Sequence, residues 1–245
     1  MARPASQAGV RVLLYHAIDR PDPADRMGLR VSPEAFRAQL TLLRDEGYRV
    51  VPLARALDGS CSNEARCVAI SFDDGYRSEV VTAAILGEFG FAATFFVVPR
   101  FLDGVKAPAH YWEAWPHMDW DNAAALAAAG FEIGAHSMTH PDLTRCDAVR
   151  LADEVGGVKT MLEARLARQV DSFSFPYGRH NSDVRQAAAR AGYRLACTSR
   201  YGVNSSSGRC YELARTEVGG TDRLVDFRHK LQGKYDWLAR WQELK

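Results

Sequence analysis

The sequence lacks several features that would place it in a special class of protein. Its 245 residues contain no apolar run long enough to cross a bilayer, and 31 basic residues balance 30 acidic ones. No basic stripe marks a surface for nucleic acid, so we expect no nucleic-acid partner. Residues 1–18 have neither a sustained apolar segment nor a convincing signal-peptide cleavage site. We therefore expect no transmembrane segment and no standard export signal.

Cysteines in metal-binding or disulfide-forming patterns are also lacking. The five cysteines, at positions 61, 67, 146, 197 and 210, are odd in number and form no Cys-x-x-Cys pair. This pattern argues against a disulfide framework and against a structural zinc knot. Cys67 and Cys197 lie in apolar, strand-like runs, so we expect them in the core. A reducing, cytoplasmic location is the expectation that follows.

What the chain does have is a regular alternation of strand-like and helix-like segments. Strand patterns cover residues 11–18, 48–53, 67–72, 92–98, 131–136, 170–177, 194–199 and 211–218. Helical patterns cover residues 33–47, 78–89, 120–129, 146–167, 181–191 and parts of 222–240. Such alternation predicts βαβ units and a parallel sheet. With about seven repeats and no linker, we expect one α/β domain, a TIM-like barrel slightly smaller than the usual ~250 residues.

Two adjacent carboxylates follow one of these strands. Asp73 and Asp74 come directly after the apolar run 67–72, and Gly75 permits a sharp change of direction there. Paired aspartates are common in solvated turns, which is the ordinary alternative. However, barrels place their chemistry at the carboxyl ends of strands, where this pair lies.

Two histidines follow another strand end. In the segment HSMTH, His136 and His140 are four residues apart, a spacing that brings two imidazoles to one side of a turn. The alternative, one histidine at the start of a helix and an unrelated histidine at the surface, is equally consistent with this pattern alone. Together with the aspartates, the histidines supply one carboxylate and two imidazoles for Zn²⁺ or another divalent transition metal. The second aspartate then remains as a general base.

Three motifs resemble those of the metal-dependent polysaccharide deacetylases, a family that contains chitin, chitooligosaccharide and peptidoglycan deacetylases. They are SFDDG (71–75), HSMTH (136–140) and FSFPYG (173–178), and the resemblance extends over about residues 10–218. It implies a distorted, incomplete (β/α) barrel of about seven strands, and hydrolytic removal of an N-acetyl group from an amino sugar. Residues 1–245 would form a single catalytic domain, with 219–245 as a helical extension.

The same resemblance assigns roles to individual residues. Asp73 would be the general base, and Asp74, His136 and His140 would bind the metal. That metal would be Zn²⁺, with Co²⁺, Mn²⁺ or Ni²⁺ as alternatives. The backbone N–H of Tyr177 would help to hold the oxyanion of the tetrahedral intermediate, as amide hydrolysis requires.

The chain departs from the family pattern in two places. Ser174 stands where the family usually has an arginine that holds the catalytic Asp73. Arg215 could supply that guanidinium from a later strand, or it could be an ordinary exposed residue at a strand end. The family's acid histidine near the C-terminus has only His229 as a candidate, in a polar helical stretch. Some members have this acid on the first strand, so we expect His16 to be the general acid.

Further residues are candidates for substrate binding. Trp112 and Trp115 lie in the irregular segment 99–118, and exposed aromatic rings near a barrel mouth stack on sugars. Tryptophan is just as often a core anchor. Pro176, in the FSFPYG segment, would also line the substrate site, whereas His180 is expected to be a solvated helix cap.

Three functions remain open at this stage. The first is an amidohydrolase acting on an acetylated amino sugar or oligosaccharide. The second keeps the same machinery but acts on an O-acetyl ester, a formyl amide or a non-sugar amide, because fold does not set substrate. The third is a catalytically silent carbohydrate-binding protein, which the missing arginine favours. The sequence carries no indication of oligomeric state.

Overall fold

The core of the protein is a parallel β-sheet wrapped nearly into a barrel. The computed structural model describes residues 9–56, 58–59, 61, 66–105, 115–205 and 210–239. The strands of the main sheet are β1 (Val10–Tyr15), β4 (Arg49–Val50), β5 (Cys67–Phe72), β6 (Thr94–Val97), β7 (Glu132–Ala135), β8 (Ser172–Ser174), β9 (Leu195–Cys197) and β10 (Arg215–Glu217). Two short strands, β2 (Ala17–Ile18) and β3 (Arg30–Val31), pair separately.

The strand order confirms the expected incomplete barrel of about seven strands. Seven strands follow one another in the order β10-β1-β5-β6-β7-β8-β9, all parallel, and β4 pairs with β5 beside this path. Between β9 and β10, a single bridge joins Cys197 to Leu213, and the Thr198 N–H donates to the Leu213 carbonyl at 2.8 Å. The sheet therefore almost closes on itself.

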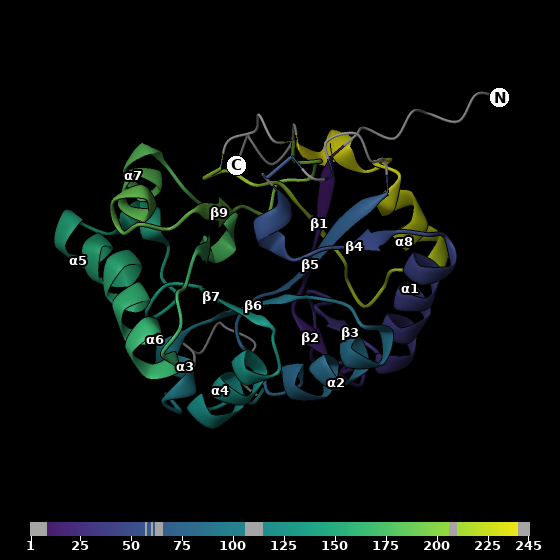
Figure 1. The fold of residues 1–245 in the computed structure, drawn as a ribbon, viewed down its shortest axis with the longest axis horizontal. Helices are drawn as coiled ribbons and strands as arrows, with labels where there is room; N and C mark the ends of the chain where they lie inside the picture. Colours follow the sequence, from purple (N-terminus) through teal and green to yellow (C-terminus); the bar gives the residue numbers. More distant parts are fainter. Residues whose placement is uncertain are drawn as a thin grey trace.

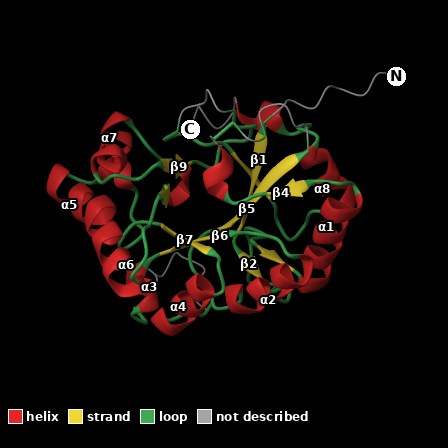
Figure 2. Cartoon of the chain, in the orientation of Figure 1, coloured by secondary structure: helices red, strands yellow, loops and turns green. Residues whose placement is uncertain are grey.

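Helices cover the outside of this sheet (Figures 1 and 2). They are α1 (Pro33–Asp45), α2 (Glu79–Phe89), α3 (Pro99–Leu102), α4 (Trp120–Ala128), α5 (Ala148–Ala152), α6 (Val158–Leu166), α7 (Ser182–Arg190) and α8 (Leu224–Leu231). The Ser32 side chain caps the start of α1, because it accepts from the Ala35 N–H. Gly90 ends α2 in the left-handed conformation, with φ of 66°.

The long helix expected over residues 146–167 is interrupted. Between α5 and α6 the chain forms a π-helical segment, η3 (Asp153–Gly157). Single π turns inside α-helices are rare in proteins overall, and those that occur are often near functional sites. This one carries Glu154, which contacts the histidine loop, residues 136–140.

Side chains of β5 alternate between the two faces of the sheet, as the pleat requires. Val68, Ile70 and Phe72 pack in the large cluster that includes side chains of the surrounding helices. Ala69 packs in the smaller cluster with side chains of neighbouring strands. Ser71 and the residue two places later, Asp73, continue the Ala69 side. The inner face of β5 thus leads directly to the first carboxylate.

The expectation about cysteines is corrected by one pair. Cys61 and Cys67 form a disulfide, although the spacing of six residues matches no disulfide signature in the sequence. Cys67 is buried as expected, and so is Cys197, which has a free thiol. Cys67 begins β5, and the two Cα atoms lie 6.1 Å apart, within the usual range for a disulfide.

Within the described part of the chain, no helix has the length and apolar character needed to span a bilayer.

Candidate metal centre and active site

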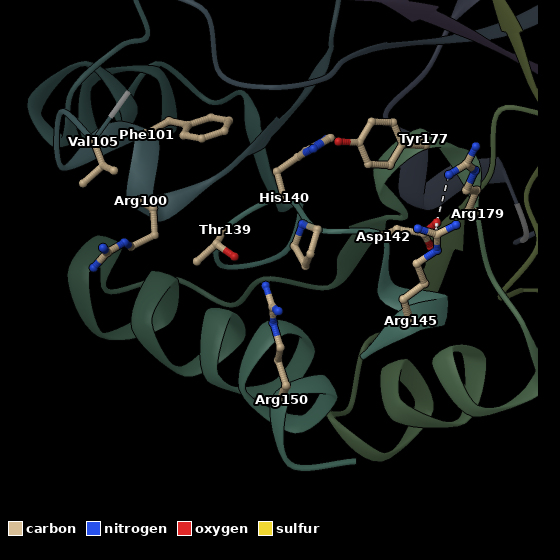
Figure 3. Close-up of a pocket in the computed structure, with 11 residues that line it drawn as sticks. Arg100, Phe101, Val105, Thr139, His140, Asp142, Arg145, Arg150, Tyr177 and Arg179 are labelled. Atoms are coloured by element: carbon tan, nitrogen blue, oxygen red, sulfur yellow. Dashed lines mark hydrogen bonds and ion pairs between the residues drawn. The ribbon is translucent and has the colours of Figure 1, made fainter. Parts of the chain in front are cut away.

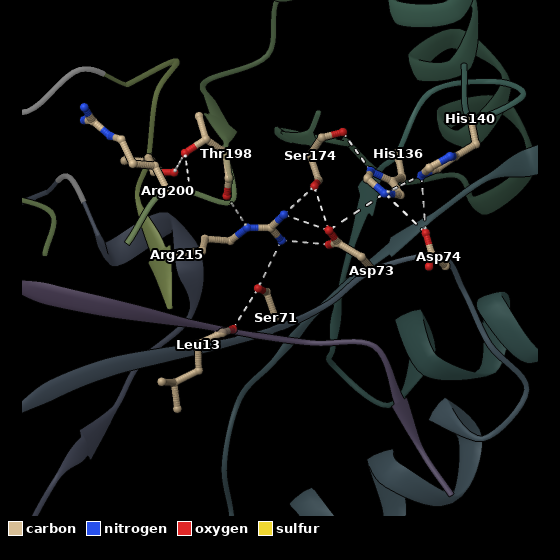
Figure 4. Close-up of polar contacts among 11 residues, drawn as sticks. Leu13, Ser71, Asp73, Asp74, His136, His140, Ser174, Thr198, Arg200 and Arg215 are labelled. Carbon is tan, nitrogen blue, oxygen red and sulfur yellow. Dashed lines mark hydrogen bonds and ion pairs between the residues drawn. The ribbon is translucent and has the colours of Figure 1, made fainter. Parts of the chain in front are cut away.

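Three side chains that sequence reasoning assigned to a metal converge at the carboxyl ends of β5 and β7. Nε2 of His136 and Nε2 of His140 each lie 3.4 Å from Oδ1 of Asp74, and the two nitrogens are 3.1 Å apart (Figure 4). All three residues are buried. The three ligand atoms therefore form a nearly regular triangle.

The size of this triangle fits a transition-metal ion. A tetrahedral Zn²⁺ with ligand bonds of about 2.0–2.1 Å separates its ligand atoms by roughly 3.3 Å. The observed separations of 3.1 to 3.4 Å match this value. Three protein ligands are also typical of catalytic zinc sites, which keep a further position for water or substrate. The residues present thus fit a catalytic divalent ion.

Hydrogen bonding and charge prepare these side chains for metal binding. Nδ1 of His136 lies 2.8 Å from the Ser174 carbonyl oxygen. Because a carbonyl oxygen only accepts, Nδ1 carries the proton and donates it, which leaves Nε2 as the atom able to bind a metal. Burial lowers the pKa of His140 to about 3, with His136 adding to the effect, so the ring is neutral. Burial alone would raise the pKa of Asp74, but the two histidines hold it below its usual value.

Backbone conformation is unusual throughout this region. Among the described residues, five non-glycine residues have φ in the left-handed region, and four of them lie at the site: Asp74, Ser137, His140 and Tyr177. Each such residue costs of order 1–3 kcal/mol, and residues of this kind cluster at active sites. The strained backbone turns the ligand side chains toward one another.

The loop between the two histidines is held from the long interrupted helix. The carboxylate of Glu154, in the π-helical segment, accepts from the Thr139 N–H at 2.9 Å and from the Thr139 hydroxyl. Within the loop, the Ser137 hydroxyl accepts from the His140 N–H at 2.9 Å. The π turn thus fixes the position of the second histidine.

The neighbouring carboxylate, Asp73, has a different environment. Arg215 donates to both of its oxygens at 2.7 Å, and the Ser174 hydroxyl donates to Oδ2 at 3.1 Å. Burial alone would raise the pKa of Asp73, but the Arg215 guanidinium holds it below its usual value. Asp73 is therefore ionised at neutral pH. It lies 3.8 Å from Nε2 of His136, beside the metal ligands.

Arg215 is fully buried, which excludes the alternative of an exposed residue at a strand end. Its Nε donates to the Thr198 carbonyl at 2.8 Å, and one terminal nitrogen also donates to the Ser174 hydroxyl at 2.8 Å (Figure 4). Ser174 stands where the family has arginine. Its hydroxyl accepts from Arg215 and donates to Asp73, so it links the two side chains. The missing guanidinium is supplied from β10.

His16 lies at the end of β1, next to the two carboxylates. Tyr15, its neighbour, accepts from the Asp73 N–H at 3.0 Å, and the His16 side chain is close enough to lower the pKa of both aspartates. Among the described residues, its buried Nδ1 has no hydrogen-bond partner. His229 is on α8, in the outer helical layer beside α1 (Figure 1).

A cavity of about 610 Å³ opens beside the metal ligands (Figure 3). Its lining includes His140 and the ring of Tyr177, which meets the His140 ring edge-on with centroids 4.8 Å apart. Tyr177 is 43% exposed, whereas Pro176 is buried beneath it. The cavity is therefore continuous with the proposed reaction site.

The two tryptophans and His180 are placed less centrally. Trp115 is 5% exposed, packs edge-on against Tyr76 and is covered by the Arg30 guanidinium. It is therefore a buried packing residue and not an exposed ring for sugar stacking. Trp112 lies outside the described residues. His180 accepts at Nδ1 from Arg185 of α7 at 3.0 Å.

Sequence reasoning missed a buried group directly behind Asp74. The Tyr76 ring stacks on the His117 ring, with the centroids 5.0 Å apart. Burial raises the pKa of the Tyr76 hydroxyl, and the nearby Asp74 carboxylate adds to this effect. The Tyr76 N–H donates to Glu79 at 2.9 Å, and Glu79 is fully buried at the start of α2. A glutamate three residues beyond the turn was the available signal, because such residues often cap a helix start.

Comparison with known proteins places the chain among deacetylases. The family model for polysaccharide deacetylases matches residues 61–196. YxkH, a proposed polysaccharide deacetylase of Bacillus subtilis (strain 168), is 27% identical over 215 residues, covering 86% of this chain and 72% of that protein. A chitooligosaccharide deacetylase of Bradyrhizobium sp. (strain ANU 289) is 30% identical over 133 residues, 52% of this chain and 53% of the relative. This chain thus matches about half the length of that relative.

Two solved structures share the fold. The Streptococcus pyogenes deacetylase PplD in complex with acetate aligns with a TM-score of 0.80 and 24% identity, covering 92% of this chain and 99% of PplD. IcaB from Ammonifex degensii aligns with a TM-score of 0.76 and 23% identity, covering 92% and 97%. At this level of identity, the likeness establishes the nearly closed (β/α) barrel.

Proposed function

Since the chain belongs to the polysaccharide deacetylase family, we propose that it is a metal-dependent hydrolase that removes N-acetyl groups from an amino-sugar-containing carbohydrate. One observation carries the proposal. Nε2 of His136 lies 3.4 Å from Asp74 and 3.8 Å from Asp73, so a three-ligand cluster and an ionised, arginine-held carboxylate share one edge. A hydrolase needs both, whereas a sugar-binding protein needs neither.

The metal would be held by Asp74, His136 and His140, and Zn²⁺ is the ion we propose. When bound, such an ion supplies Lewis acidity, which polarises an acyl carbonyl and lowers the pKa of water.

Asp73 is the general base in this mechanism. Its two oxygens offer about four acceptor positions. Arg215 and Ser174 occupy three of these positions, so one remains for the proton of the attacking water. Because Arg215 keeps Asp73 ionised, the carboxylate is ready to accept that proton at neutral pH.

His16 and Tyr177 act on the tetrahedral intermediate. The Tyr177 N–H donates to the developing oxyanion, as backbone N–H groups do in the oxyanion holes of acyl-transfer enzymes. His16 donates a proton to the leaving amine nitrogen, because an unprotonated amine leaves poorly. Histidine suits this role, since its ordinary pKa is near neutral.

The proposal extends to the organisation of the chain. Residues 1–245 would form one catalytic domain, with 219–245 as a helical extension that includes α8. An acetylated amino sugar or oligosaccharide would be the substrate. Trp112 stays a proposed sugar-stacking residue, whereas Trp115 is buried, and the exposed Tyr177 ring beside the cavity offers a further surface for stacking.

Acetate release from N-acetylated chitooligosaccharides tests this proposal, with p-nitrophenyl acetate as an ester probe. We expect release that a chelator abolishes and Zn²⁺ or Co²⁺ restores. Hydrolysis of the ester with no release from any amide would move the assignment to O-acetyl esters. Absence of both reactions in fully metallated protein would favour a silent binding protein.

Two variants separate the metal site from the base. His140→Ala removes a ligand, so elemental analysis should find much less metal in it than in the wild type. Asp73→Asn is the matched control, because it should keep its metal and lose roughly 10²–10⁴-fold in rate, the usual contribution of a base. A fully metallated and active His140→Ala protein would remove His140 from the ligand set.

A further inference from the structure

The cavity beside the metal ligands has a strongly basic lining. Four of its eleven lining residues are arginines, namely Arg100, Arg145, Arg150 and Arg179, and one is a carboxylate, Asp142. The whole chain has a net charge of only +1. The positive charge in this cavity is therefore a local concentration and not a property of the protein surface in general.

The four arginines reach the cavity from different elements. Arg100 is on α3 and Arg150 is on α5, while Arg145 ends one short 3₁₀ turn, η2 (Leu143–Arg145), and Arg179 follows another, η4 (Pro176–Gly178). Figure 3 shows Arg150 rising toward the histidine loop, and Arg145 and Arg179 together beside Asp142. Separate elements thus bring cations to one space.

Among the described residues, most of this charge is not neutralised. Asp142 lies 2.8 Å from Arg179 and 3.7 Å from Arg145, so one carboxylate serves two guanidinium groups. Glu154 lies 3.8 Å from Arg150, but it is buried and already accepts from Thr139. The side chains of Arg145, Arg150 and Arg179 are 83%, 58% and 60% exposed.

We propose that this cavity selects anionic acetylated glycans, in which sugars next to the cleaved N-acetyl group carry a carboxylate or a phosphate. The inference rests on the proposed function, because it concerns the substrate of the same site. Guanidinium groups bind carboxylate and phosphate oxygens through paired N–H donors, and a neutral oligosaccharide offers no such partner.

The position of the cavity supports this assignment. His140, a proposed metal ligand, and Tyr177, the proposed oxyanion residue, are part of its lining. A sugar ring on the exposed Tyr177 face would place the neighbouring sugar within reach of Arg150 and Arg179. Phe101 and Val105 supply the apolar part of the lining, which suits the carbon faces of the sugar rings.

The experiment compares three tetrasaccharides of β-linked N-acetylglucosamine. One is neutral, one carries lactyl ether carboxylates on alternate sugars, and one carries phosphate monoesters. Acetate release gives kcat/KM for each, at low salt and at about 0.5 M salt. We expect kcat/KM for at least one anionic substrate to exceed that for the neutral one about tenfold. The advantage should shrink at high salt, because salt screens exposed charges.

Variants assign the preference to the cavity. Arg145→Gln/Arg150→Gln should lose most of the anionic advantage, measured as the ratio of kcat/KM for each anionic tetrasaccharide to that for the neutral one. Arg168→Gln is the control, because Arg168 is an exposed arginine that does not line the cavity. It should behave as the wild type. The arm with the larger advantage identifies carboxylate or phosphate as the recognised group.

Binding gives a second measurement that does not depend on turnover. Calorimetry of the anionic tetrasaccharides with Asp73→Asn protein should show affinity that falls when Arg145 and Arg150 are both replaced. Equal kcat/KM for all three substrates would overturn the inference, while the acetate released would uphold the proposed function. Arginine-dependent binding without acetate release from any substrate would instead overturn the proposed function alone. If the protein shows neither acetate release nor arginine-dependent binding, both the inference and the proposed function are overturned.

Discussion

The carboxylate of Asp73 and the guanidinium of Arg215 are both buried, and each charge is tolerated because the other is present. The sequence left this contact open, because Arg215 was equally consistent with an exposed strand end. Sequence spacing does not show which face of a short strand points inward. The convergence of Asp74, His136 and His140 was easier to predict, because these residues follow two recognisable strands directly.

Replacing Arg215 by methionine should change the pH dependence of activity. In the proposed mechanism Asp73 is the ionised base, so activity should be lost as the pH falls through its pKa. Arg215 lowers that pKa, and its removal should raise it, so the acidic limb of the kcat/KM profile moves to higher pH.

A lysine at this position is the control. Arg215→Lys keeps the positive charge but loses the paired donors, so its profile should lie between those of the wild type and Arg215→Met. Since removal of one buried partner costs about 3–5 kcal/mol, urea unfolding should show the methionine variant clearly destabilised. An unchanged acidic limb in a folded Arg215→Met protein would contradict the assigned role.

The role of His16 can be separated from simple support of the site by changing the leaving group. His16→Ala should reduce hydrolysis of an N-acetyl amide by roughly 10²–10⁴-fold, because the amine needs a proton as it leaves. Hydrolysis of p-nitrophenyl acetate should change little, since its phenolate leaves without protonation. Equal losses on both substrates would point to a structural role for His16, or to an acid elsewhere.

At the scale of secondary-structure elements, burial decided how well boundaries could be predicted. The continuous apolar run 67–72 became β5 without a residue of error, because both of its faces are covered. The predicted strand 48–53 shortened to β4, since Pro52 has no N–H to donate to a neighbouring strand. The disulfide between Cys61 and Cys67 was not predicted, because the spacing of the two cysteines matches no recognised disulfide pattern.

Strand β7, which leads to His136, depends on a glycine for close packing. A Cβ atom added to Gly134 would lie 2.4 Å from the Phe96 ring and 2.7 Å from the Ser172 hydroxyl. Gly134→Ala should therefore lower the free energy of unfolding by about 1–3 kcal/mol. Urea denaturation monitored by circular dichroism measures this change.

The same substitution in α2 provides a control of opposite sign. A Cβ atom at Gly87 would meet no atom within 4 Å, and the residue lies inside the helix. Gly87→Ala should therefore stabilise the protein by roughly 0.4–1 kcal/mol. Equal effects at the two positions would show that packing around Gly134 yields easily.

At the scale of the whole molecule, the metal ligands tie together two strand ends that are separated by one strand. Asp74 follows β5, whereas His136 and His140 follow β7, with β6 between them. A ligand that binds only the folded protein stabilises it by about 2.7 kcal/mol at 100 times its dissociation constant. For a protein of this size, each kcal/mol shifts Tm by about 2–4 °C.

Chelation should therefore lower the thermal stability as well as the activity. We expect Tm to fall by roughly 5–10 °C when the metal is removed, and to recover when Zn²⁺ is added. Differential scanning calorimetry makes the measurement, with His140→Ala as the control that should respond little to chelator. A Tm unaffected by chelator in protein shown to have lost its metal would mean that the site contributes nothing to stability.

The order in which the chain is made gives the Asp73–Arg215 contact a further consequence. The two residues are 142 positions apart, and β10 lies beside β1, the first strand of the sheet. A ribosome adds about 5–20 residues per second, so Arg215 is synthesised roughly 7–30 s after Asp73. During that interval the nascent barrel has no guanidinium with which to bury this carboxylate. The proposed base is therefore held in place only when β10 docks beside β1, and a chain terminated before Arg215 cannot form this contact.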